Sequence, residues 1–98
     1  MGAATHVVYI LECADGSFYV GSTANLEFRL RAHRSGRAST FTSRRLPVTL
    51  VFQELHSEPK DALAREKQIK RWSRAKKAAL ITGDLIALHS HARRRKGR

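Results

Sequence analysis

Two short runs of apolar residues near the start of the chain predict a β-hairpin. Residues 6–12 (HVVYILE) and 18–22 (FYVGS) are rich in β-branched and aromatic residues, and residues 14–17 (ADGS) between them are typical turn formers. A third run of the same character, residues 48–55 (VTLVFQEL), follows a proline. The pattern therefore predicts three strands, of which the first two pair as antiparallel neighbours.

The length of the hairpin loop decides which side chains share a face of the sheet. A two-residue Asp15-Gly16 turn would place Tyr9 and Tyr19 on opposite faces. A three-residue loop with Gly16 in the left-handed region would place both tyrosines on the same face. We expect the three-residue loop, which brings the two phenols together.

Helical periodicity accounts for most of the remaining chain. Apolar positions recur at helical spacing in residues 25–35, which begin with an asparagine suited to a helix start and are followed by a glycine suited to its end. A second helix is expected from about residues 57–59 to residue 72, with further helical turns at 74–82 and 84–91. Residues 37–46 are expected to form a basic connector. The fold class that follows is α+β.

The charge of the chain points to a polyanionic partner. Across 98 residues, lysine and arginine number 19 against 8 aspartate and glutamate, which gives a net charge of +11 and a sequence pI near 11.1. Nucleic acid is the first candidate partner, and an anionic membrane surface is its rival. A hydrophobic content of 42% is compatible with a folded core, so the charge does not indicate disorder.

Several classes of protein are excluded by what the chain lacks. The single cysteine, Cys13, cannot form an intramolecular disulfide or a cysteine-rich zinc site, which fits a reducing compartment. No apolar run approaches the roughly 18 to 20 residues of a membrane span, and the start of the chain lacks the features of a signal peptide. We therefore expect a cytoplasmic protein with one domain at residues 1–85 and a basic, flexible tail at residues 86–98.

Glu66 is an unusual residue for its position on a helix. In the helix expected to end near residue 72, Ala62, Leu63 and Ile69 mark the apolar stripe, and Glu66 falls inside that arc. Burying an ionised carboxylate without a partner is costly, so Glu66 must line a wet cleft, pair with a cation or hold a metal. Taken by itself, the pattern favours a structural ion pair with a nearby arginine.

The helix expected at residues 25–35 places two more polar residues beside its apolar stripe. His33 lies within the stripe, and Arg29, one turn earlier, lies at its edge, so the two share a face. Each alone is more typical of a hydrogen-bonded core histidine or of an arginine stem lying along the surface. Together with Glu66 and the two tyrosines, they suit the cleavage of a phosphodiester bond.

Each of these side chains has a chemical role in such a reaction. Glu66 could hold Mg²⁺, which often takes only one or two carboxylates and leaves room for phosphate and water. Arg29 could bind the non-bridging oxygens of the phosphate, on which negative charge gathers during attack. The side chains that could orient or deprotonate the attacking water are those of Tyr9, Tyr19 and His33.

The same residues resemble the signatures of a known family, the GIY-YIG nucleases, and in particular its small single-domain bacterial branch, the UPF0213-like proteins. The first signature falls on residues 7–9 (VVY) and the second on residues 19–21 (YVG). Arg29 matches the family's arginine, ten residues past the second tyrosine, and His33 matches a histidine or tyrosine one turn later. Glu66 matches the single metal-binding glutamate. The match covers residues 6 to about 72, and a later stretch extends it to about residue 85.

The resemblance implies a fold, a site and a cofactor. It implies a three-stranded antiparallel sheet flanked by helices, with a phosphodiesterase site on one sheet face that depends on Mg²⁺ or Mn²⁺. Tyr9 would then be the general base, Tyr19 and His33 would position water or phosphate, and Gly21 would allow the backbone to approach the site. Two features depart from the family pattern. Val7 and Val8 replace a glycine and an isoleucine, and the only asparagine, Asn25, precedes Glu66.

Two functions compete on these grounds. The first is a metal-dependent endonuclease that binds DNA without sequence preference, on branched, damaged or single-stranded forms, in DNA repair or processing, with a protein partner left open. The second is a non-catalytic nucleic-acid-binding protein that keeps the fold. Association with a membrane is not expected. In both cases the nucleic-acid contacts are expected from basic residues of the connector, the later helices and the tail, namely Arg44, Arg45, Lys70, Arg71, Arg74, Arg93, Arg94 and Arg95.

Overall fold

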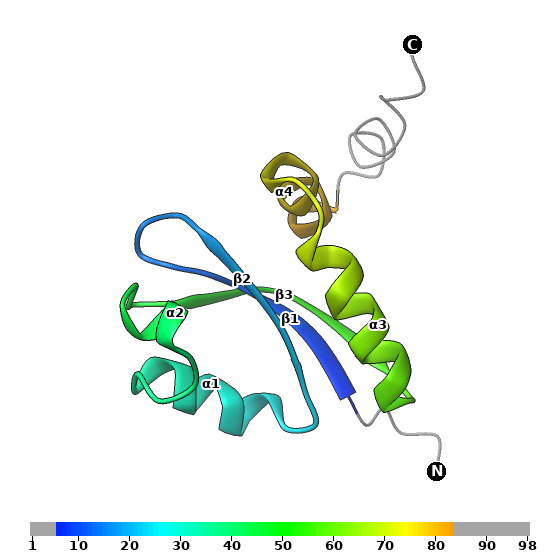
Figure 1. Ribbon diagram of the computed structural model, residues 1–98, viewed down its shortest axis with the longest axis horizontal. Coiled ribbons are helices and arrows are strands. Elements are labelled where there is room, and N and C mark those ends of the chain that lie inside the picture. Colours follow the sequence, from blue (N-terminus) through cyan, green and yellow to red (C-terminus); the bar gives the residue numbers. More distant parts are fainter. Residues whose placement is uncertain (1–5, 84–98) are drawn as a thin grey trace.

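The computed structural model describes residues 6–83 and has an α+β fold built on one antiparallel sheet (Figure 1). The central strand β1 (His6–Glu12) pairs with β2 (Phe18–Thr23) on one side and with β3 (Thr49–His56) on the other. The helices α1 (Leu26–Arg34) and α2 (Thr40–Ser43) lie on one side of the sheet, and α3 (Pro59–Lys70) and α4 (Arg74–Thr82) lie on the other. The expected fold class and the flanked three-stranded sheet are confirmed.

The hairpin loop has three residues, as expected. The backbone N–H of Cys13 donates to the Ser17 carbonyl oxygen at 2.8 Å, and the N–H of Gly16 donates to the Cys13 carbonyl oxygen at 2.9 Å. Gly16 has a φ of 86°, a conformation that a residue with a Cβ avoids. The resulting register pairs Tyr9 with Gly21, so the side chains of Tyr9 and Tyr19 lie on the same face of the sheet.

Each face of the sheet carries its own buried cluster. The face toward α3 buries Val8, Ile10 and Val20 of β1 and β2 against Ala62 and Ile69 of that helix. The face toward α1 buries the cluster of Tyr9, Leu11, Cys13 and Val48, against which Leu26 and Leu30 of α1 pack. Because β2 is an edge strand, the side chains of both faces can meet solvent at its free edge.

The helix boundaries follow the expected signals at α1. The side chain of Asn25 accepts a hydrogen bond from the Phe28 N–H at 3.0 Å and so caps the first turn. Gly36, with a φ of 80°, follows the last turn. Both signals are local in sequence, which is why the helix could be placed from the sequence.

One expectation about the other helices needs correction, and another is extended. The basic connector at residues 37–46 contains the one-turn helix α2, which Ser39 caps by accepting from the Thr42 N–H. Leu63 is 48% exposed and does not belong to the buried stripe of α3, because the helix contacts the sheet through Ala62 and Ile69. The helical turn expected at 84–91 and the tail at 86–98 lie outside the described residues. Over residues 6–83, no helix combines the length and apolar character needed to cross a membrane.

Candidate active site

Tyr9 lies across the neighbouring strand because its partner there is a glycine. A Cβ built on Gly21 would lie 2.6 Å from the Tyr9 hydroxyl oxygen and 2.7 Å from Cζ, so no other residue fits without displacing the phenol. The phenol therefore extends over β2 toward the free edge of the sheet. Gly21 does permit a close approach, as expected, but the group that approaches is the Tyr9 side chain rather than the backbone.

Tyr9, Tyr19 and His33 form a compact cluster on this face. The Tyr9 hydroxyl group lies 2.9 Å from His33 Nε2, and His33 is fully buried. The Tyr19 ring meets the imidazole edge-on with centroids 4.9 Å apart, and the centroids of the two phenols are 6.4 Å apart. Three elements, β1, β2 and α1, thus bring together the three side chains that the sequence singled out as water-orienting groups.

The environment keeps both Tyr9 and His33 in their neutral forms at neutral pH. Burial raises the pKa of Tyr9, and the charges of Tyr19 and Glu66 raise it further, against an opposing effect of Arg29. Burial also lowers the pKa of His33, and the charge of Arg29 lowers it further. Arg29 of α1 therefore lies close enough to act on both groups. A neutral imidazole beside a neutral phenol can accept the phenol's proton.

Glu66 reaches the same place from the other side of the sheet. Its Oε1 accepts a hydrogen bond from the Ser22 hydroxyl group at 2.6 Å, and its Oε2 lies 2.9 Å from Lys70 Nζ. The side chain of Glu66 is only 14% exposed, so its expected inward orientation is confirmed. The expected ion pair is formed, with Lys70 rather than an arginine.

The position of Ser22 corrects the expectation that the site lies on one sheet face. Side chains alternate along a strand, so Ser22 points away from the face that carries Gly21 and Tyr19. Glu66, which Ser22 contacts, therefore approaches from the α3 side, while the phenols and His33 belong to the α1 side. The candidate site spans the free edge of β2.

The donor set around Glu66 fits a hard divalent cation better than zinc. Within residues 6–83, no group of three or more histidine, cysteine, aspartate or glutamate side chains is arranged to hold a metal ion. Mg²⁺ does not need such a group, because it keeps several waters and binds through one or two carboxylates and substrate phosphates. Glu66, with the Ser22 hydroxyl group beside it, could hold such an ion if the Lys70 ammonium group withdrew.

The basic residues expected to bind nucleic acid fall into different situations. Arg44 and Arg71 are exposed, and Lys70 is held by Glu66. Arg93, Arg94 and Arg95 lie outside the described residues.

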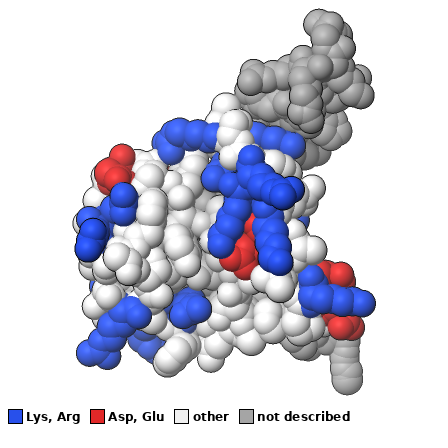
Figure 2. All heavy atoms as spheres, in the orientation of Figure 1, with Lys and Arg blue, Asp and Glu red and all other residues white. Residues whose placement is uncertain are grey.

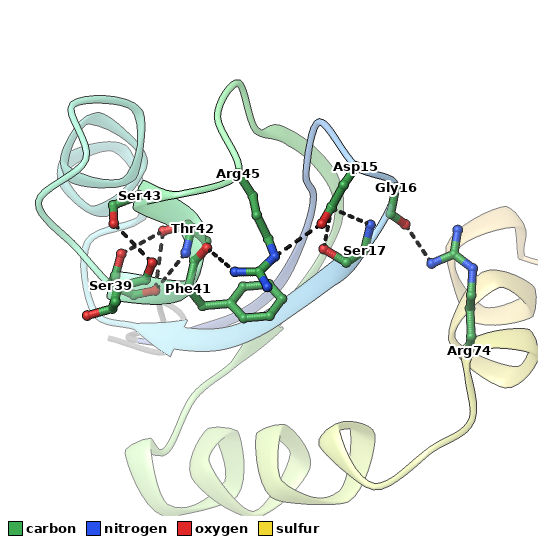
Figure 3. Close-up of polar contacts among 10 residues, drawn as sticks. Asp15, Gly16, Ser17, Ser39, Phe41, Thr42, Ser43, Arg45 and Arg74 are labelled. Atoms are coloured by element: carbon green, nitrogen blue, oxygen red, sulfur yellow. Dashed lines mark hydrogen bonds and ion pairs between the residues drawn. The ribbon is translucent and has the colours of Figure 1, made fainter.

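Two of the expected basic residues brace the hairpin loop instead of projecting freely (Figure 3). The Arg45 side chain donates to Asp15 at 3.1 Å and to the Phe41 carbonyl oxygen at 2.9 Å. Its guanidinium group lies 3.8 Å from the centroid of the Phe41 ring. On the other side of the loop, Arg74 donates to the Gly16 carbonyl oxygen at 2.6 Å. These two guanidinium groups tie the loop to α2 and α4.

A basic groove along α1 was not assigned a role from the sequence. The groove encloses about 730 Å³ and is lined by Phe28, Arg29, Arg31, Ala32, Arg34, Ser35 and Arg37. Phe28 is 61% exposed within it. Arg29 lines this groove and also belongs to the candidate site, so the two share one residue. The run of arginines in the sequence was the available signal for it.

Comparison with known proteins decides the family. The GIY-YIG catalytic domain matches residues 5–79, which is most of the chain. The chain belongs to the GIY-YIG family. The resemblance carried by residues 7–9, 19–21, Arg29 and Glu66 is thereby confirmed at the level of the family.

Relatives within the GIY-YIG family match nearly their full length. The chain is 44% identical over 78 residues to a UPF0213 protein of Staphylococcus haemolyticus, covering 80% of this chain and 95% of that protein. It is 38% identical over 92 residues to a UPF0213 protein of Bacillus pumilus, covering 91% and 94%. The solution NMR structure of the UPF0213 protein BH0048 from Bacillus halodurans is similar with a TM-score of 0.54 and 38% identity, covering 81% of this chain and 84% of that one.

Membership of the GIY-YIG family indicates a general class of activity. The family's catalytic domain supports a nuclease-type hydrolase with a nucleic acid as its substrate. GIY-YIG nucleases generally use divalent metal ions. The UPF0213 names of the relatives specify no substrate.

Proposed function

We propose that this chain is a divalent-metal-dependent endonuclease that hydrolyses phosphodiester bonds in DNA, through phosphate contacts that do not depend on sequence. One observation carries the proposal. Side chains from β1, β2, α1 and α3 meet at the free edge of β2, and they are Tyr9, Tyr19, Arg29, His33 and Glu66. They supply the base, the phosphate-binding cation and the metal ligand that such a reaction requires.

Tyr9 and His33 together provide a route for the proton of the attacking water. At neutral pH the phenol of Tyr9 is protonated, so it needs an acceptor for its own proton before it can take another. His33 Nε2 lies 2.9 Å from the hydroxyl oxygen and is that acceptor. As water attacks phosphorus and the bond to the leaving oxygen breaks, a proton passes from water to Tyr9 and the phenol's proton passes to His33. Solvent then protonates the leaving oxygen.

Arg29 and Glu66 act on the charge of the phosphate. The guanidinium group of Arg29 stays protonated and can donate two parallel hydrogen bonds to non-bridging oxygens. Glu66 would hold Mg²⁺ or Mn²⁺, which when bound stabilises the negative charge that develops on the phosphate. Tyr19, whose ring packs edge-on against His33, keeps the imidazole in place beside Tyr9.

The surface around the site is suited to a polyanion. Figure 2 shows basic side chains gathered over α3 and α4 and again beside α1, with acidic atoms enclosed among those over α3. The groove along α1 adds three arginines that the site itself does not use, Arg31, Arg34 and Arg37. Contacts of this kind bind phosphates without reading bases, which supports sequence-independent binding.

The decisive experiment is cleavage of labelled single-stranded, duplex and branched DNA, with and without Mg²⁺ or Mn²⁺. The wild type is compared with Glu66→Gln, which keeps the size of the side chain but removes its charge. Glu58→Gln is the matched control, because Glu58 is exposed and makes no side-chain cap bond at the start of α3. Metal-dependent cutting that is lost in Glu66→Gln and kept in Glu58→Gln supports the proposal. Cutting that persists unchanged in Glu66→Gln contradicts it.

One observation favours the second function, a nucleic-acid-binding protein that keeps the fold without catalysis. The Lys70 ammonium group lies 2.9 Å from Glu66 Oε2, an oxygen that a metal ion bound by Glu66 would need. If the ion pair held during nucleic-acid binding, the chain would bind DNA in a salt-dependent way and cut none of the substrates. The same experiment, with binding measured beside cleavage, separates the two functions.

A further inference from the structure

Thr42 is a buried polar residue that neither packing nor the roles above explain. It belongs to α2 and has no exposed surface, yet it is the partner of a site residue. Its hydroxyl oxygen lies 2.9 Å from His33 Nδ1. It also lies 3.4 Å from the Ser39 carbonyl oxygen and 3.3 Å from the Ser39 hydroxyl oxygen, a network that Figure 3 shows around α2. A row of hydrogen-bonding groups therefore runs from Tyr9 through His33 and Thr42 to Ser39.

The acceptors at Ser39 indicate one direction for the hydrogens in this row. A neutral imidazole has one N–H and one acceptor nitrogen. The Ser39 carbonyl oxygen, 3.4 Å away, can only accept, and when the Thr42 hydroxyl group donates to it, the lone pairs of that hydroxyl face His33 Nδ1–H. His33 Nε2 is then the acceptor that faces Tyr9. The reverse direction would put the imidazole proton on Nε2 and leave the phenol's proton without an acceptor on the ring.

We propose that Thr42 is a positioning residue for the nuclease reaction: its hydroxyl group holds His33 in the Nδ1–H tautomer, so that Nε2 can take the proton of Tyr9. The inference rests on the proposed function, because the tautomer matters to the reaction only if Tyr9 is the base. When His33 has taken that proton, the Nδ1–H bond to Thr42 is unchanged. The tautomer itself can be tested without any nuclease activity.

The short helix α2 is part of the same arrangement. Ser39 accepts from the Thr42 N–H at 3.1 Å and from the Ser43 N–H through its carbonyl oxygen at 2.9 Å, which closes the single turn. This turn fixes the backbone of Thr42 against α1. A flexible connector between α1 and β3 would not hold a hydroxyl group within hydrogen-bond distance of a buried imidazole.

The variants separate the hydroxyl group of Thr42 from its bulk. Thr42→Val keeps the shape and removes the hydroxyl group, and Thr42→Ser keeps the hydroxyl group and removes the methyl group. Thr40→Val makes the same change at an exposed position of α2 and is the matched control. If Thr42 only fills space, Thr42→Val should resemble the wild type and Thr42→Ser should be the more damaging change.

The first measurement is the tautomer of His33 by long-range ¹H–¹⁵N NMR correlation at neutral pH. We expect Nδ1–H in the wild type, in Thr42→Ser and in Thr40→Val, and a mixture of tautomers in Thr42→Val. A wild type with the proton on Nε2 overturns the inference, and so does a Thr42→Val variant with the wild-type tautomer. If Thr42→Val does not fold, Thr42→Ala takes its place in this measurement, with the same expectation and the same result overturning the inference.

The second measurement is steady-state cleavage of DNA with these variants. We expect kcat to fall about 10- to 100-fold in Thr42→Val, the range found when a group that orients a metal-binding histidine is removed, with KM little changed. Thr42→Ser should restore most of kcat. An unchanged kcat in Thr42→Val overturns the inference. A wild type with the Nδ1–H tautomer but no cleavage of any substrate contradicts the proposed function and leaves the role of Thr42 in setting the tautomer intact.

Discussion

Tyr9 reaches the free edge of the sheet only because Gly21 lies opposite it in β2. Gly21→Ala places a methyl group against two Tyr9 atoms that lie within 2.7 Å of the new carbon. We expect the phenol to move away from His33, DNA cleavage to be lost and the free energy of unfolding to fall by about 1–3 kcal/mol, as for overpacked cores. Cleavage assays and urea denaturation measure the two effects.

Gly83→Ala is the control for this substitution. Among residues 6–83, a Cβ there meets no atom within 4 Å, although the φ of 76° makes alanine strained. Cleavage should therefore be retained in Gly83→Ala while some stability is lost. Equal cleavage by the Gly21 and Gly83 variants would contradict the role given to Gly21.

His33 should make the fold less stable in mild acid. Its pKa in the folded protein is lowered by burial and by Arg29, so the unfolded chain takes up the proton first as the pH falls. The contribution of His33 to stability is therefore complete above its ordinary pKa of about 6.5 and is lost progressively below it. Urea denaturation between about pH 5 and 8 should show a smaller loss of stability for His33→Asn than for the wild type. Parallel curves would contradict the prediction.

The sequence could identify only those site residues whose position along an element is unusual. Glu66 and His33 stand out because a polar residue at helical spacing among apolar ones needs a reason. Ser22 and Thr42 do not stand out, because serine and threonine are ordinary in a strand and a loop. Their importance comes from contacts with residues distant in the sequence, which no local pattern contains.

At the scale of elements, the hairpin loop connects the two helical layers, because Arg45 ties it to α2 and Arg74 ties it to α4. Gly16→Ala would force a residue with a Cβ into the φ of 86°. We expect a loss of about 1–2 kcal/mol in the free energy of unfolding, the cost of the left-handed conformation. Urea denaturation measures it.

Ala14→Gly, in the same loop, is the comparison for Gly16→Ala, because it changes a loop residue that shows no positive φ. It should cost less stability than Gly16→Ala. A Gly16→Ala variant as stable as the wild type would mean that the loop can adopt another conformation without penalty.

The elements that the sequence predicted well are those whose signals are local. The hairpin register follows from a turn of three residues, and α1 follows from its cap and its terminal glycine. The helix α2 could not be predicted in this way, because four residues have too little periodicity, and its contact between Thr42 and His33 joins two different elements. The apolar pattern of α3 places Leu63 in the core, but only Ala62 and Ile69 are buried there. The buried stripe of α3 is therefore narrower than its apolar residues suggest.

At the scale of the whole molecule, the groove along α1 should carry part of the nucleic-acid affinity. The double variant Arg34→Ala/Arg37→Ala removes two of its charges without touching the candidate site. The slope of log K against log salt is negative, and each lost phosphate contact reduces its magnitude by about 0.9 on duplex DNA. Titrations at several salt concentrations, in the Glu66→Gln background to prevent cleavage, should therefore give a clearly shallower slope.

Lys60→Ala/Lys67→Ala provides the same change of charge on α3, across the sheet from α1. Its salt dependence should stay closer to that of the parent protein. If the two double variants weaken binding equally, the groove is no more than a share of the general positive charge.

If Glu66 holds the metal as proposed, its ion pair with Lys70 means that metal binding exchanges one cation for another. The Lys70 ammonium group would then occupy the place of the divalent ion, the site would be assembled before any metal binds, and metal binding would replace one positive charge by two. A phosphate that attracted Lys70 would release Glu66 for the metal. Linkage then requires the metal to strengthen phosphate binding by the same factor. Substrate and metal would thus strengthen each other's binding. Without either of them, the Glu66 carboxylate would stay neutralised by Lys70.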